Sequence, residues 1–444
     1  MPNPMTRKRA HQSHGLAVEK NQLVRAVAAS TIGTAIEWYD FFLYGLAAAL
    51  VFPQRFFPAS DPLTGMLLSF STFSVGFVAR PVGAALFGHY GDRVGRKAVF
   101  FATLLLMGIG TAGIGLLPDY NTIGSWGAVL LTVGRILQGL AVGGQWGGSV
   151  LLATEWSDDR RRGFTGSWPH FGAPVGLVLA NGAVLLMIHI SGAGFMTWGW
   201  RIPFCFSVVL VVVGLYVRFG VRETPVFSKL KEEGRVAASP VLEVFRHNWR
   251  EVFLTMLVRT GAQGPFYIFT TYIVTYGTRT LGFPQRTILN FVLLQSVLSC
   301  FAIPFFGHLS DRIGRRRLLI IGAAAMVVWP YAYFAMLDSR VPVLVLIAVI
   351  FGLPVHDIQY GPQAAFFAEA FPGRLRYSGA SIGYQLASIT AGGPTPIIAL
   401  WLLDRFHTSM AVATYMACLA AVALLGLALL PDRSHMSFRR DGPD

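Results

Sequence analysis

Charged residues are scarce in this chain, and their scarcity sets its class. Only 13% of the 444 residues are Asp, Glu, Lys or Arg, whereas 54% are apolar. In soluble globular proteins about a quarter of the residues are charged. The composition therefore excludes a soluble domain and favours a chain whose segments lie within a lipid bilayer.

Cysteine is scarce as well. Cys205, Cys300 and Cys418 each lie alone inside an apolar run, without the spacing of a disulfide framework or a metal site. The chain has no recognisable nucleophile and base set, so we expect neither an enzyme, a metal site nor a cofactor. The net charge of +14 does not indicate nucleic acid as a partner, because the cations lie in the gaps between apolar runs.

Long apolar runs recur along the whole chain. A membrane-spanning helix needs about 20 residues of this kind. The expected spans are 24–50, 63–90, 98–117, 125–153, 164–190, 200–220, 249–278, 285–309, 318–338, 341–369, 377–403 and 408–430. We predict an all-α integral membrane protein with about twelve transmembrane helices in two six-helix bundles.

Lysine and arginine predict the orientation of these spans. The termini and every second gap hold 27 of the 36 cations. The positive-inside rule then makes both termini cytoplasmic. The expected division is a cytoplasmic tail at 1–23, bundles at 24–220 and 249–430, a cytoplasmic linker at 221–248 and a second cytoplasmic tail at 431–444. An inner (plasma) membrane is implied only by the family resemblance given below.

One ten-residue pattern occurs twice, 219 positions apart. Gly88-His-Tyr-Gly-Asp-Arg-Val-Gly-Arg-Lys97 returns as Gly307-His-Leu-Ser-Asp-Arg-Ile-Gly-Arg-Arg316, each time between two apolar runs. An ordinary basic loop would explain the cations, but not the aspartate and glycines at the same spacing. The repeat indicates two homologous halves.

Acidic residues inside the first span are the first candidate site. Glu37, Asp40 and Tyr44 are spaced so that they share one helix face. A carboxylate within the membrane is costly and is a functional candidate by default. We predict that Asp40 and Glu37 couple transport to a proton; the alternative is that either acid only pairs with a cation to hold helices together.

Polar residues in three later spans complete the candidate site. Arg135 stays charged in any environment and needs an anionic partner, for which Asp40 and the substrate are the candidates. A permanent structural ion pair is the alternative. His356 and Asp357 are adjacent and point about 100° apart, so they are not both expected to face the centre. The predicted substrate-facing residues are Tyr44, Arg135, Gln138, Gln145, Arg259, Gln263, Tyr267, Tyr360 and Gln385.

Several motifs together resemble one family. They are Glu37-Trp-Tyr-Asp40-Phe, Phe77-Val-Ala-Arg80-Pro81, Gly134-Arg135-Ile-Leu-Gln138-Gly139, Gly143-Gly144-Gln145-Trp-Gly147-Gly148, Gly199-Trp200-Arg201-Ile-Pro203-Phe204 and Arg376-Tyr-Ser-Gly379-Ala-Ser. The repeated loop resembles that of the major facilitator superfamily. The set is similar to its metabolite:proton symporters, which carry shikimate, 2-oxoglutarate, citrate or proline/betaine, and most resembles the shikimate-carrier branch.

The resemblance implies a two-bundle fold with a central cavity and alternating access. It also implies that the repeated loop and its helix-end partners act as a gate. The residues concerned are Gly88, Asp92, Arg93, Gly95, Arg96, Glu155, Arg162, Gly307, Asp311, Arg312, Arg315, Glu369 and Arg376, with Glu155–Arg162 and Glu369–Arg376 as corresponding partners in each half. One departure is Gln145, which stands where the family pattern has glutamate and cannot titrate.

The sequence thus predicts proton-coupled uptake of a small polar metabolite, with an organic acid as the expected class. A uniporter or exporter without proton coupling is one alternative, and a betaine carrier that uses Trp38, Tyr39 and Tyr44 is another. A membrane enzyme or transporter-like sensor is remote, because neither a catalytic set nor a signalling domain is recognisable. The expected partners are the substrate, the proton and the lipid bilayer, with the protein acting as a monomer.

Overall fold

The protein is a bundle of long helices. The computed structural model describes residues 4–94, 96–219, 225–234 and 239–434, and within these ranges there is no β-strand. The N-terminal half contains α1 (Pro4–Leu50), α2 (Phe52–Phe56), α3 (Pro62–Val94), α4 (Arg96–Leu116), α5 (Tyr120–Ile123), α6 (Trp126–Glu155), η1 (Asp159–Arg161), α7 (Arg162–Ser191), η2 (Gly192–Met196) and α8 (Arg201–Phe219).

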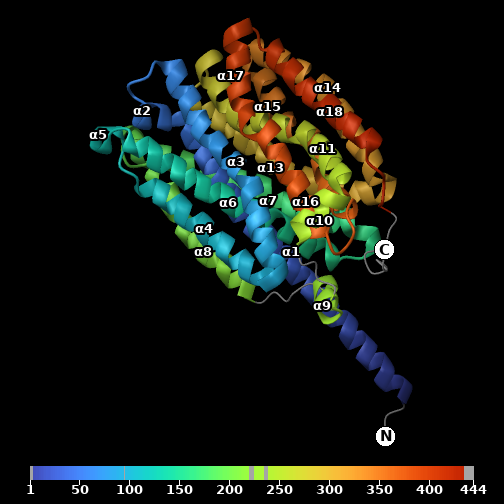
Figure 1. The fold of residues 1–444 in the computed structure, drawn as a ribbon. Coiled ribbons are helices and arrows are strands. Elements are labelled where there is room, and N and C mark those ends of the chain that lie inside the picture. The colour runs from blue at the N-terminus through green and yellow to red at the C-terminus, as the bar shows by residue number, and fades with distance from the viewer. Residues whose placement is uncertain (1–3, 95, 220–224, 235–238, 435–444) are drawn as a thin grey trace.

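The C-terminal half repeats this plan after two short helices, α9 (Pro225–Glu232) and α10 (Pro240–His247). Its long segments are α11 (Trp249–Tyr267) continued by η3 (Ile268–Tyr272), α12 (Ile273–Thr275) and η4 (Tyr276–Thr280), then α13 (Gln285–Ile313), α14 (Arg315–Asp338), α15 (Pro342–Glu369), α16 (Arg376–Ala387) continued by η5 (Ser388–Gly392) and α17 (Pro394–Phe406), and α18 (Met410–Leu429). In Figure 1 the blue-to-green half lies beside the yellow-to-red half.

The helices have the length and composition of membrane spans. Eight described helical segments are long and apolar enough to cross a bilayer, and two shorter apolar helices cover Phe101–Leu116 and Arg201–Val217. The other two long segments are α1, which carries Glu37 and Asp40, and the segment that begins with α11 and carries Arg259. Ionisable residues thus interrupt the apolar character of these two segments. The fold class predicted from the sequence is confirmed.

Glycines bring α3 and α6 into close contact. A Cβ on Gly139 would lie 2.1 Å from the carbonyl oxygen of Gly76, and one on Gly143 would lie 1.9 Å from that of Arg80. A real Cβ cannot approach so closely, so only glycine allows this spacing. Small residues at such contacts are the usual means by which helices approach in membranes. The contact fixes Arg80 of α3 beside the polar face of α6.

Two helical segments change their winding in the middle. The α11 segment contains Pro265 and then the π-helical turns η3 and η4, and η5 is a third π-helical turn between α16 and α17. Proline removes a backbone donor, and π-helical turns are frequent at functional sites. The turn η3 is buried and η5 is partly buried, and both lie next to polar residues described below.

The α3–α6 contact gives a direct prediction. Gly143→Ala forces the two helices apart and is expected to destabilise the protein by about 1–3 kcal/mol or more. Thermal unfolding of the purified protein in detergent measures this loss as a lower midpoint temperature.

Gly113→Ala is the matched control, since no atom lies within 4 Å of a Cβ at that helical position. It is expected to leave stability unchanged or to raise it by up to about 1 kcal/mol. Equal melting temperatures for the two variants would contradict this account of the contact.

Candidate functional site

Two buried arginines lie against a common set of aromatic rings in the N-terminal half. Arg80 of α3 and Arg135 of α6 are 1% and 0% exposed. The guanidinium carbon of Arg80 lies 4.3 Å from the ring centre of Phe41, and that of Arg135 lies 4.1 Å from the same ring. Phe77 also contacts Arg80 at 4.4 Å, and Tyr44 contacts Arg135 at 4.4 Å. Cation–π contacts replace part of the lost hydration of both charges.

Arg135 does not form the ion pair with Asp40 that the sequence led us to expect. Its Nη1 donates to Gln138 Oε1 at 3.0 Å, and Gln138 Nε2 donates to Thr111 Oγ1 at 2.7 Å. The Nη2 atom of Arg135 is buried without a hydrogen-bond acceptor. Gln138 and the aromatic rings surround the guanidinium group, so the predicted ion pair between Arg135 and Asp40 is not formed.

Asp40 is fully buried and unpaired in the described structure. Its exposed fraction is 0%, and neither carboxylate oxygen has a hydrogen-bond partner. Thr111 of α4 and Glu37 of α1 are close enough to influence its charge, although the Thr111 hydroxyl does not meet hydrogen-bond geometry with it. Glu37 is also buried, at 4% exposure. A buried carboxyl without a counter-charge is more stable with its proton bound.

A third buried arginine comes from the C-terminal half. Arg259 of α11 donates from Nη1 to Gln363 Oε1 and from Nη2 to Tyr384 Oη, both at 2.7 Å. The Tyr384 ring also lies 4.1 Å from the guanidinium carbon. Its Nε atom has no acceptor. Among the described residues no carboxylate lies within ion-pair distance of Arg80, Arg135 or Arg259.

Tyr267 connects the two halves of the site. Its ring lies 5.0 Å from Phe77 and 5.8 Å from Phe41, and its buried hydroxyl has no hydrogen-bond partner. It lies within electrostatic reach of all three arginines. The buried polar atoms in this region that lack a partner are both Asp40 oxygens, Arg80 Nε, Arg135 Nη2, Gln145 Oε1, Arg259 Nε, Gln263 Oε1 and Tyr267 Oη. Such atoms are rare in folded proteins, and water or a bound solute can supply the missing partners.

The other predicted substrate residues are buried but mostly bonded to protein. Tyr44 donates to Thr72 Oγ1 at 2.7 Å, and Gln145 Nε2 is 3.5 Å from the Gly33 carbonyl oxygen. Gln263 Nε2 donates to Ser388 Oγ at 3.3 Å. Gln385 Nε2 donates to the Val142 carbonyl oxygen across the halves at 3.4 Å.

An aromatic stack crosses the two halves beside the site. Tyr384 of α16 stacks on Trp146 of α6 at 3.9 Å between ring centres, and Tyr360 of α15 stacks on His170 of α7 at 4.0 Å. Trp146 Nε1 donates to His170 Nε2 at 3.4 Å. Arg80, Tyr384 and His170 are not among the substrate-facing residues predicted above. The signal for Arg80 was an intramembrane arginine before a proline, but nothing in the sequence indicated the stack.

The second copy of the repeated loop joins the halves at what we call the basic end, where Arg162, Arg315 and Glu369 lie. Asp311 of α13 accepts hydrogen bonds from the backbone N–H groups of Gly163 and Phe164, the first turn of α7, at 2.8 Å each. A carboxylate at a helix N-terminus satisfies its free donors and its dipole.

Buried ion pairs surround this cap. Arg162 pairs with Glu369 at 3.0 Å, and Glu369 also pairs with Arg315, which contacts Asp311 at 3.0 Å. The Arg162–Glu369 pair joins the two halves; the predicted partners Glu155–Arg162 and Glu369–Arg376 within each half stay a prediction. Arg312 is exposed. Glu155 and Arg376 are buried at the same end.

The first copy of the loop is only partly described. Gly88 faces Tyr377 and Ser378 of the other half, and Gly307 packs against Gly163 and Ser167. Gly95 and the side chains of Asp92, Arg93 and Arg96 lie outside the described residues.

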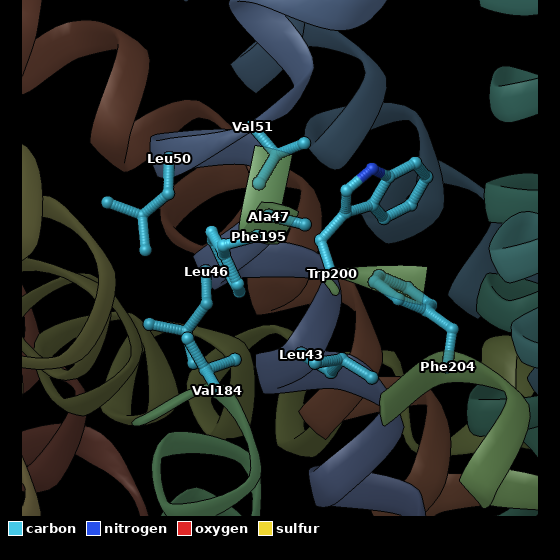
Figure 2. Close-up of a pocket in the computed structure, with 9 residues that line it drawn as sticks. All are labelled: Leu43, Leu46, Ala47, Leu50, Val51, Val184, Phe195, Trp200 and Phe204. Atoms are coloured by element: carbon cyan, nitrogen blue, oxygen red, sulfur yellow. The ribbon is translucent and has the colours of Figure 1, made fainter. Parts of the chain in front are cut away.

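A small pocket lies away from these charges. Figure 2 shows that its lining comes from α1, α7, η2 and α8 and includes Leu43, Val184, Phe195, Trp200 and Phe204. The lining is almost wholly apolar, so it offers nothing to recognise a polar solute.

The fold and the polar site between its halves define a multi-pass membrane transporter. A family model described as the Major Facilitator Superfamily matches residues 30–393. The chain belongs to that superfamily and is a transporter of metabolites.

Several transporters are similar to this chain along nearly their whole length. The inner membrane metabolite transport protein YhjE of Escherichia coli is 41% identical over 94% of this chain and 96% of its own. The shikimate transporter of the same species is 39% identical over 92% and 94%, and its proline/betaine transporter is 34% identical over 92% and 83%. The solved proton:xylose symporter XylE has the same fold, with a TM-score of 0.73, 19% identity, and coverage of 93% of this chain and 97% of that chain.

The Arg259 contacts give a second prediction. Tyr384→Phe keeps the ring against Trp146 but leaves Arg259 Nη2 without its acceptor. We expect a loss of about 1–3 kcal/mol in stability, measured by thermal unfolding. Tyr331→Phe is the matched control, because the Tyr331 hydroxyl makes an exposed bond to Thr414. If both variants melt alike, the Tyr384 hydroxyl does not stabilise the buried charge.

Proposed function

We propose that the protein is a proton-driven symporter that imports a small organic anion by alternating access. The observation that carries this proposal is the set of three fully buried guanidinium groups, from both halves, without a carboxylate partner among the described residues. Arginine does not lose its proton under physiological conditions, and unpaired buried charge is costly. A carboxylate of the substrate supplies the missing negative charge between Arg80, Arg135 and Arg259.

The aromatic residues favour an anion over a betaine. A quaternary ammonium binds to open aromatic faces. Here the faces of Phe41, Tyr44 and Phe77 are already in contact with guanidinium groups. Tyr39, a candidate for such a cage, donates its hydroxyl to the Pro203 carbonyl oxygen at 2.7 Å and is part of the helix packing. The shikimate transporter among the relatives is consistent with an acid substrate.

Asp40 is the proposed proton carrier in the N-terminal half. It is buried without a partner, and Thr111, Gln138 and Arg135 connect its surroundings to the substrate arginines. Gln145 cannot take this role, because an amide does not titrate. One charge moving down about 100 mV supplies about 2.3 kcal/mol, which supports roughly a 50-fold substrate gradient.

The proposed orientation follows from the cations. With the basic end cytoplasmic, the positive-inside rule is satisfied and both termini are cytoplasmic. The inner-membrane relative in Escherichia coli supports the same location. The Asp311 cap and the Arg162–Glu369 pair then close the cytoplasmic side, and they separate when the site opens inward. An exporter or uniporter without proton coupling remains the second candidate, which Gln145 favours.

Uptake by the purified protein in liposomes tests the proposal. We expect labelled shikimate, 2-oxoglutarate or citrate to accumulate only with an inside-alkaline gradient, and betaine not to accumulate. Asp40→Asn removes the proton carrier, so gradient-driven uptake is expected to fall by about tenfold or more, in line with the gradient that one proton supports. Counterflow of the same substrate should fall much less.

The control for this substitution is Asp61→Asn, an exposed residue that accepts only local backbone bonds from Leu63 and Thr64. It should transport like the unchanged protein. Uptake that ignores the gradient would refute symport, and betaine uptake alone would refute the anion.

The cap at the basic end generates a further prediction. Asp311→Asn keeps one acceptor but removes the charge that binds two N–H groups of α7, a contribution of about 1.5–3 kcal/mol. The population open at the basic end is therefore expected to rise by about tenfold or more.

Cysteine-reagent labelling of a single cysteine introduced at Ser167 reports this opening, since Ser167 is covered by Gly307 of the other half. The protein for this assay carries alanine at the three native cysteines. Unchanged labelling in Asp311→Asn would show that the cap does not hold the end closed.

A further inference from the structure

A histidine and an aspartate in α15 form a buried pair that the transport site above does not use. His356 and Asp357 are 0% and 1% exposed. His356 Nδ1 lies 3.0 Å from Asp357 Oδ1, and Ser299 Oγ of α13 donates to Asp357 Oδ2 at 2.5 Å. The second ring nitrogen, Nε2, lies 3.1 Å from the Ala262 carbonyl oxygen of α11. Both side chains are buried, but they face different helices.

Hydrogen-bond accounting fixes the proton content of this pair. A carbonyl oxygen only accepts, so His356 Nε2 must carry a hydrogen. The contact between His356 Nδ1 and Asp357 Oδ1 needs one more proton, either on the ring or on the carboxyl. The pair therefore holds one proton beyond neutral histidine and aspartate-carboxylate, and its net charge is zero in both arrangements.

Loss of that proton cannot leave both contacts intact. A neutral imidazole has one N–H. If it points to Asp357, Nε2 presents a lone pair to the Ala262 carbonyl; if it points to Ala262, Nδ1 presents a lone pair to the carboxylate. A carboxylate is a stronger acceptor than a backbone carbonyl, so the single N–H is expected to stay bonded to Asp357 and the bond from α15 to the Ala262 carbonyl of α11 is the one lost.

The contact between His356 and the Ala262 carbonyl lies in the turn of α11 that precedes Pro265. Pro265 has no backbone N–H, which leaves the Gly261 carbonyl without its partner in the helix. Gln359 Nε2 of α15 lies 3.4 Å from the Gly261 oxygen, one residue before the Ala262 carbonyl that His356 binds. Two side chains of α15 therefore hold the bent turn of α11, which lies between the candidate substrate residues Arg259 and Gln263.

The surroundings contain other groups that respond to charge. His170 of α7 lies within electrostatic reach of both Arg259 and His356. The Cys300 thiol of α13 lies near Asp357. Tyr360 of α15 contacts the His356 ring at 5.2 Å, and Tyr384 of α16 lies beyond it on Arg259. Of these groups only Arg259 carries a permanent charge.

We propose that His356 and Asp357 form a second proton-binding site, in the C-terminal half, whose proton holds α15 to the bent turn of α11. The proton is exchanged with water when one end of the bundle opens. Its release breaks the His356–Ala262 contact, so that of these two side chains only Gln359 still binds the turn between Arg259 and Gln263. This proposal rests on proton-coupled transport, and it adds a site separate from Asp40.

Infrared difference spectra of the purified protein between about pH 5 and about pH 9 test the site without transport. The shared proton gives either a carboxyl C=O band or an imidazolium ring band. We expect this band to be absent in Asp357→Asn and changed in His356→Gln, whose amide still donates to Ala262. Asp40→Asn and Asp61→Asn should retain it. Spectra of both α15 variants identical to the unchanged protein would overturn the proposal.

Transport measurements separate this proposal from the general one. In liposomes, Asp357→Asn and His356→Gln should lower the ratio of gradient-driven uptake to counterflow by about tenfold. If the unchanged protein responds to the gradient and both variants keep its ratio, the second site is refuted while symport stands. If the unchanged protein ignores the gradient, symport fails, and the infrared bands alone decide whether the pair binds a proton.

Discussion

Three positive charges that cannot be neutralised lie in the middle of this protein. Arg80, Arg135 and Arg259 are removed from water, and the described residues provide them with ring faces, amide oxygens and a phenol rather than carboxylates. Each of these contacts is weaker than an ion pair, so the site without substrate is left short of negative charge. In the proposed mechanism an anion that contacts both halves relieves this shortage, so that binding favours the closing of one half on the other.

The helix packing determines where these three charges lie relative to one another. Gly139 and Gly143 allow α3 to lie directly on α6, so that Arg80 and Arg135 share the Phe41 ring. In the C-terminal half the missing N–H of Pro265 bends α11 and exposes carbonyls that α15 binds. In the N-terminal half the close α3–α6 contact thus positions Arg80 and Arg135. In the C-terminal half Arg259 is positioned by a turn of α11 whose hydrogen bonds to α15 can change.

The sequence predicted the spans, the repeat and the burial of Arg135 and Arg259, because these depend on local composition and on the cost of charge in a membrane. It did not predict which side chains or backbone groups these buried charges bind. Arg135 was expected to pair with Asp40, but Gln138, three residues further along α6, reaches the guanidinium first. The Asp311 cap on α7 joins residues 147 and 148 positions apart, and no local pattern specifies which helix end comes to lie there. Which of several neighbouring groups a side chain binds depends on how the helices pack, and a local sequence pattern does not contain that information.

Contacts between the halves lie on both sides of the site. At the basic end they are the Asp311 cap and the buried Arg162–Glu369 pair; on the other side the Ser74 hydroxyl donates to the Gly393 carbonyl oxygen at 2.5 Å. The basic end thus joins the halves through a carboxylate on backbone N–H groups and a buried ion pair. At the opposite ends of α7 and α13, Arg286 donates to His189 Nδ1 at 3.2 Å, and this contact is exposed. Exposed charged contacts contribute less than buried charged hydrogen bonds, so we expect the resting molecule to open more readily away from the basic end.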